Sequence, residues 1–150
     1  MFENIENLNK TASIAVSAFG VEGNAVFVQI SENATYFICQ NNKPKYTLRI
    51  CRPNYHTFEE LESEIQWLLN IDNVNICKPI SKNGEYVKKI NGCYCTMYKY
   101  IDGMADIEIE GNENLYIEIG RIAGLLHKNT IEKPFKAVRP KWRSEERRVG

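Results

Sequence analysis

The sequence predicts an α+β domain: an antiparallel sheet of about five strands with one helix packed behind it. Two observations predict this class. Short runs rich in β-branched and aromatic residues alternate with turns rich in Asn and Gly. One clearly amphipathic helical stretch interrupts the series after the third run. Strands joined by tight turns pair antiparallel, and a helix with a single apolar face has to bury that face against another layer.

The first third of the chain predicts a helix followed by three strands. Residues 4–19 carry apolar side chains at helical spacing, and Gly20 is expected to end that helix. The three strands are expected at residues 25–30, 35–39 and 45–52. Turns are expected at residues 31–34 and 41–44, and Pro53 stops the third strand.

The remainder predicts a second helix, further strands and a last helix. The second helix spans about residues 57–70, with Thr57 as N-cap and Glu60 three residues later as a capping box. Further strands are expected at residues 77–80, 85–90 and 93–101, with hairpin turns at Asn83-Gly84 and Asn91-Gly92. The last helix is expected at about residues 113–128.

Charge and composition exclude several classes of function. Lys plus Arg number 19 and Asp plus Glu number 19, so the chain carries no formal net charge and no electrostatic drive toward nucleic acid or an acidic membrane surface. No run of 18 apolar residues is present, and the acidic first residues are unlike a signal peptide. We therefore expect a cytoplasmic protein without nucleic-acid or membrane partners.

The five cysteines are odd in number and scattered through strand-like stretches. We interpret them as small buried apolar residues of a reducing compartment. Cys93-x-Cys95 is only half of a tetrahedral metal site, and neither His56 nor His127 stands at a spacing that completes one.

One pair of charged residues stands out once the elements are assigned. At 100° per residue, Glu64 falls inside the apolar arc of the second helix, between Ile71 and Leu68. Arg49 alternates with its apolar neighbours in the third strand and so points to the opposite face from them. A carboxylate turned toward the sheet needs a partner. Spacing alone leaves two interpretations open: a plain ion pair, or the cation–glutamate pair with which kinase folds hold ATP phosphates.

Several segments, taken in order and spacing, resemble the aminoglycoside phosphotransferase superfamily, closest to its homoserine-kinase-like and stress-response-kinase branch. They are residues 31–36, 46–53, 62–68, 78–80, 98–103 and 120–127. The resemblance covers roughly residues 15–142 and implies a protein-kinase-like N-terminal lobe. It implies a nucleotide-binding lobe at residues 1–103, then a linker and the first helix of a truncated C-terminal lobe at 104–142. Residues 143–150 do not fit the family and are interpreted as an artefactual tail.

The resemblance also implies cofactors and binding residues. ATP with Mg²⁺ would be the cofactor. A turn over the phosphates would be formed by Ser31, Glu32, Asn33, Ala34 and Thr35. Arg49 takes the place of the family's phosphate-binding lysine, with Glu64 as its helix partner. Tyr100 and Ile101 would form the hinge along the adenine edge.

Parts of the family's catalytic machinery are missing from the printed sequence. Neither His56 nor His127 begins an H-x-D-x-x-x-x-N segment, so no catalytic and no metal-binding residue is assigned. The resemblance thus implies an ATP-dependent phosphotransferase fragment, inactive alone, whose intact parent acts on a small-molecule hydroxyl. The alternative is a standalone, non-enzymatic nucleotide-binding or protein-interaction module. An exposed apolar face on the last helix predicts self-association through Leu115, Ile119, Ile122 and Leu126.

Overall fold

The computed structural model describes residues 2, 4–103 and 111–139. The tail at 143–150 and the first part of the predicted linker lie outside these residues. The elements are α1 (Ile5–Ala18), β1 (Asn24–Ile30), β2 (Asn33–Gln40), β3 (Lys43–Cys51), α2 (Phe58–Leu69), β4 (Val87–Ile90), β5 (Cys93–Lys99) and α3 (Glu113–Glu132). The predicted α+β class with a five-stranded antiparallel sheet is confirmed.

The sheet has the strand order β1-β2-β3-β5-β4, and every pair is antiparallel. Tight two-residue turns join β2 to β3 and β4 to β5, where Asn41, Asn42, Asn91 and Gly92 all have positive φ. That conformation matches the twist of paired strands and suits Asn and Gly. The two edge strands differ in length and charge. Strand β1 has seven residues and none of them is charged, whereas β4 has only four residues, two of which are Lys88 and Lys89.

Helix α1 covers one face of the sheet. Leu8, Ala12 and Ala15 of this helix are buried. They belong to one cluster with the alternate residues of the central strands, Ala34, Tyr36, Ile38, Leu48, Ile50, Cys95 and Met97, which have no measurable exposure. Alternation along a strand makes this a continuous apolar layer.

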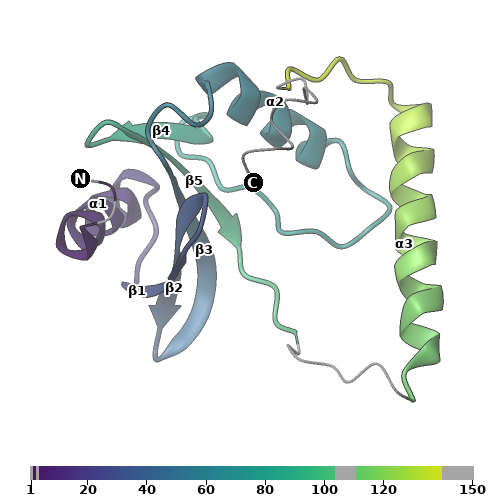
Figure 1. The fold of residues 1–150 in the computed structure, drawn as a ribbon, viewed down its shortest axis with the longest axis horizontal. Coiled ribbons are helices and arrows are strands. Elements are labelled where there is room, and N and C mark those ends of the chain that lie inside the picture. Colours follow the sequence, from purple (N-terminus) through teal and green to yellow (C-terminus); the bar gives the residue numbers. More distant parts are fainter. Residues whose placement is uncertain (1, 3, 104–110, 140–150) are drawn as a thin grey trace, which may run out of the picture.

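The opposite face is only partly covered by α2. This is the packed helix that the sequence predicted, and α1 adds a second helix on the other face. Leu61 and Ile65 of α2 are buried in a second cluster with Cys51, Val87 and Tyr98. Figure 1 shows α1 and α2 on different sides of the sheet. The central strands carry apolar residues on both faces, which is why two helices are needed.

Three smaller predictions require correction. The turn predicted at 31–34 is shorter, because Asn33 and Ala34 already pair with β3 as part of β2. The turn at 41–44 is likewise limited to Asn41 and Asn42, and Pro44 lies in β3. The strand predicted at 77–80 forms only an isolated bridge between Pro79 and Tyr98, since proline has no N–H to continue a ladder.

Helix α3 stands apart from the sheet and is four residues longer than predicted (Figure 1). Of the predicted exposed residues, Ile119 is 53% exposed, whereas Leu115, Ile122 and Leu126 are half-buried. The most exposed apolar side chains are instead Ile117 at 71% and Ile131 at 80%. The buried residue of α3 is the polar Asn129. Within the described ranges, no helix has the length and apolarity that a bilayer crossing demands.

Candidate functional site

The predicted contact between β3 and α2 is present. Arg49 Nη1 lies 3.1 Å from Glu64 Oε1, and the two side chains are 25% and 39% exposed. Glu64 is therefore partly exposed to solvent. Its position within the apolar arc of α2 had predicted a more buried side chain. The pairing of a sheet guanidinium with an acid of the next helix is confirmed.

Local sequence explains how α2 presents this acid. Thr57 accepts a hydrogen bond from the Glu60 N–H, and the Glu60 carboxylate accepts one from the Thr57 N–H, so the predicted capping box fixes where the helix begins. Leu61 and Ile65 are one helical turn apart and both bury against the sheet. Glu64 flanks that buried stripe and reaches β3 from its side.

Arg49 is held by more than Glu64. Its Nη2 donates to the Tyr98 hydroxyl at 3.1 Å, and its guanidinium carbon lies 5.6 Å from the centre of the Tyr98 ring. Burial alone would lower the pKa of Arg49, but the attraction of Tyr98 and Glu64 outweighs it and leaves that pKa raised. Arg49 is thus a fixed cation.

One donor of this cation remains unused. Arg49 Nε is buried and has no hydrogen-bond partner within the described part of the chain. A buried N–H without a partner costs roughly 1–3 kcal/mol, more when it is charged. Because this nitrogen is shielded from solvent, an anionic ligand could accept from it only after a neighbouring side chain moves aside.

The open part of the same face forms an apolar floor, which sequence reasoning missed. Val26, Phe37, Thr47 and Tyr98 pair in a row across β1, β2, β3 and β5. Thr47 is two residues from Arg49 in β3, so this row and Arg49 share one face. Val26 is 48% exposed, and Phe37 and Thr47 are half-buried. The signal that could have found this row is the cross-strand register, which can be read only after all four strands are aligned.

The predicted hinge adjoins this floor. The Tyr100 ring makes an edge-on contact with Phe37, with centroids 5.2 Å apart, and the Tyr100 N–H donates to the Lys45 carbonyl at 3.0 Å. Ile101 is 39% exposed. Tyr100 therefore borders the same surface as Arg49, at the end away from α2.

The five residues predicted as a phosphate turn are divided by the structure. Ser31 and Glu32 form the turn itself, and the Ser31 N–H donates to the Asn33 carbonyl at 3.0 Å. Ala34 is fully buried on the α1 face and offers no side chain to this site. Thr35 pairs directly with Arg49, so it lies on the face of the cation.

The metal interpretation of Cys93 and Cys95 gains no support. Both thiols are buried, and burial raises the pKa of Cys95 above the normal range, which keeps it protonated. Among the residues that the structure describes, no three His, Cys, Asp or Glu side chains lie close enough to hold a metal ion.

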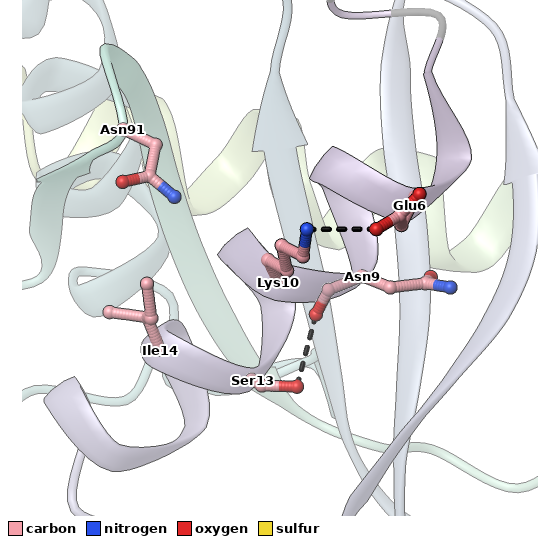
Figure 2. Close-up of a pocket in the computed structure, with 6 residues that line it drawn as sticks. All are labelled: Glu6, Asn9, Lys10, Ser13, Ile14 and Asn91. Carbon is pink, nitrogen blue, oxygen red and sulfur yellow. Dashed lines mark hydrogen bonds and ion pairs between the residues drawn. The ribbon is translucent and has the colours of Figure 1, made fainter.

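A shallow hollow of about 560 Å³ lies elsewhere, over α1 and the Asn91 turn (Figure 2). The polar groups drawn there are partly used within α1, where Glu6 pairs with Lys10 at 2.8 Å and Ser13 donates to the Asn9 carbonyl. Because α1 covers the face opposite Arg49, this hollow is separate from the candidate site.

A basic residue on the third strand, paired with an acid of the next helix beside an open apolar floor, is the arrangement of a kinase-type nucleotide-binding lobe. The chain is 29% identical over 141 residues to the amicoumacin kinase of Bacillus subtilis (strain 168), covering 88% of this chain and 41% of that protein. The predicted resemblance to aminoglycoside phosphotransferase-like kinases is thereby confirmed. No protein-family model matches the chain.

Solved kinases share the fold. A structure of amicoumacin kinase hAmiN in complex with AMP-PNP, Ca²⁺ and Ami superposes with a TM-score of 0.75 at 20% identity, over 96% of this chain and 48% of that one. A microcompartment-associated aminopropanol kinase gives 0.70 at 21% identity, over 95% and 46%. The chain thus spans less than half the length of each of these relatives.

Proposed function

We propose that this chain is the nucleotide-binding part of an ATP-dependent small-molecule phosphotransferase. The observation that carries the proposal is Arg49, a half-buried cation fixed by Glu64 and Tyr98 with one buried N–H still unpaired. The kinases to which the chain is similar support the same class.

In this proposal the nucleotide lies along the open face of the sheet. The base stacks over Phe37 and Thr47 with its edge toward the backbone of Tyr100 and Ile101. The phosphates run toward Arg49, close to Asn33 and Thr35 on the same face and beneath the turn at Ser31 and Glu32, with Ala34 supplying only strand backbone. A guanidinium suits a phosphate because it offers several donors in one plane.

Transfer to an acceptor is proposed for the longer protein, not for this chain alone. The acceptor would be a hydroxyl of a small molecule, as the names of the related kinases suggest. Mg²⁺ accompanying the triphosphate would take its protein ligands from outside the described residues. Free cysteines and the use of ATP favour a cytoplasmic location.

Titration of the purified chain with ATP tests the binding proposal. Arg49→Ala should weaken ATP at least about tenfold, because hydrogen bonds to charged groups contribute roughly 1.5–3 kcal/mol. Arg121→Ala is the matched control, since Arg121 is exposed on α3 and pairs only with Glu118 among described residues. Equal ATP affinity in Arg49→Ala and the parent would remove the proposed role of Arg49.

A further part of the proposal concerns self-association through α3. Tyr116, Ile117, Ile119 and Ile131 are each more than half exposed, an unusual concentration of large apolar side chains on one helix. We expect the isolated chain to form concentration-dependent oligomers through this helix.

A further inference from the structure

Polar contacts fasten α2 to a segment from the other end of the chain. This segment, residues 125–138, contains the last two turns of α3 and the residues after them, and we name it the α3 strap. Its contacts reach the middle of α2 at Ser63 and the end of α2 at Asn70 and Asp72. Neither the ion pair with Arg49 nor the proposed nucleotide site explains them.

The contact in the middle of α2 is next to the site. Ser63 is buried, and its Oγ accepts a hydrogen bond from the Val138 N–H at 2.8 Å. Ser63 immediately precedes Glu64, so one residue of the helix is fixed to the strap while the next faces Arg49. Neighbouring helical residues point about 100° apart, which allows both contacts at once.

The contacts at the end of α2 centre on Asn129, the only residue of α3 that is buried. Its amide Nδ2 lies 3.2 Å from both the Asn70 carbonyl and Asp72 Oδ1. Lys133 Nζ donates to the same carbonyl at 3.3 Å and to Asp72 at 2.5 Å. The last carbonyls of a helix lack partners within the helix, so these bonds complete the end of α2.

A buried amide on an otherwise exposed helix has a cost unless its bonds are made. The sheet holds α2 mainly through Leu61 and Ile65, and apolar contacts are non-directional, so they do not by themselves fix the rotation of the helix. A shift of about 1 Å would take the 3.1 Å pair of Arg49 and Glu64 close to the 4 Å limit of an ion pair. Directional hydrogen bonds from the strap remove that freedom.

We propose that Ser63 and Asn129 are positioning residues: through them the α3 strap sets α2 so that Glu64 faces Arg49. The strap thereby prepares the cation before any ligand arrives. This inference rests on the proposed function for its binding consequence only, because the geometry of the ion pair can be measured without nucleotide.

The first test observes Arg49 directly in the full chain without nucleotide. Nitrogen-15 NMR of the arginine side chains should show a slowly exchanging Arg49 Nε–H signal, assigned by its loss in Arg49→Lys. Ser63→Ala and Asn129→Asp should increase its exchange rate at least threefold, whereas Ser63→Thr, which keeps the hydroxyl, should restore protection. Lys128→Ala is the matched control beside Asn129, because Lys128 is 66% exposed.

The second test uses ATP affinity in a double-mutant cycle. Ser63→Ala should weaken ATP about two- to tenfold, the range of one hydrogen bond. In the Glu64→Gln background the same change should have no further effect, because Ser63 acts on Arg49 through the Glu64 ion pair and this variant lacks that pair. A Ser63→Ala loss that is equal in both backgrounds would show a general effect on stability and overturn the proposal.

The two tests separate the two proposals. If the parent chain binds no ATP, the proposed function fails, and the NMR measurement alone decides the role of the strap. If Arg49 exchange is unchanged in Ser63→Ala and Asn129→Asp, the strap does not position α2, whatever the ATP affinity.

Discussion

The ion pair of Arg49 and Glu64 should contribute measurably more to folding stability than a surface pair. Its atoms are 3.1 Å apart, which gives a Coulomb energy of about 5 kcal/mol at a dielectric constant of about 20 and about 1.3 kcal/mol in bulk water. Glu64 is 39% exposed, so the effective value lies toward the lower bound. We expect a coupling free energy of about 1–2 kcal/mol.

A double-mutant cycle with Arg49→Met and Glu64→Gln, followed by urea unfolding, measures this coupling. Lys10 and Glu6 on α1 supply the control cycle, because their charged atoms are 2.8 Å apart and their side chains are 65% and 76% exposed. An exposed helix pair of this spacing should couple by only about 0.3–0.5 kcal/mol. If the two cycles give the same coupling, partial burial does not strengthen the Arg49 pair and our reasoning about the site is refuted.

Three further predictions follow from other contacts. Thr57→Ala should destabilise the chain by about 1 kcal/mol in urea unfolding, because it breaks the capping box of α2, and Thr57→Ser should restore most of the loss. Lys133 lowers the pKa of Asp72, mainly through their hydrogen bond. The ionised Asp72 therefore stabilises the fold above the ordinary Asp pKa of about 3.9. This stabilisation is lost as the pH falls through the lowered pKa of the folded state. Carbon-13 NMR should place the Asp72 midpoint below about 3.9 and return it toward that value in Lys133→Ala; an unchanged midpoint would contradict the contact. Ile117→Glu should reduce oligomers of the isolated chain in analytical ultracentrifugation, and an identical distribution in the variant would exclude this face of α3.

The parts of the fold encoded by neighbouring residues could be predicted from the sequence. The capping box of Thr57 and Glu60 and the Asn91-Gly92 turn depend on a few adjacent side chains, and both are present. Arg49 and Glu64 could be paired because strand alternation and helical periodicity each fix a direction. What remained open was their exposure, which depends on how much of α2 the sheet covers.

Features that depend on distant segments could not be predicted. Asparagine is common in turns, yet Asn33 is the first residue of β2. It pairs with Cys51 because the neighbouring strand β3 extends that far. The apolar floor was hidden by irregularities at Val28 and Lys45, where each strand carries one extra residue and the register moves by one. The burial and hydrogen bonds of Asn129 could not be predicted from the sequence pattern, because its partners are more than 50 residues away.

The unequal margins of the sheet have a practical consequence for work with this chain. At one margin, β4 is only four residues long and carries the exposed Lys89, which disfavours pairing with a strand of another molecule, whereas the seven residues of β1 carry no charge. Heating or storage at high concentration should therefore seed fibrils from β1 first. A lysine introduced at Gln29, which is exposed, would be the first substitution to try when the protein precipitates during purification.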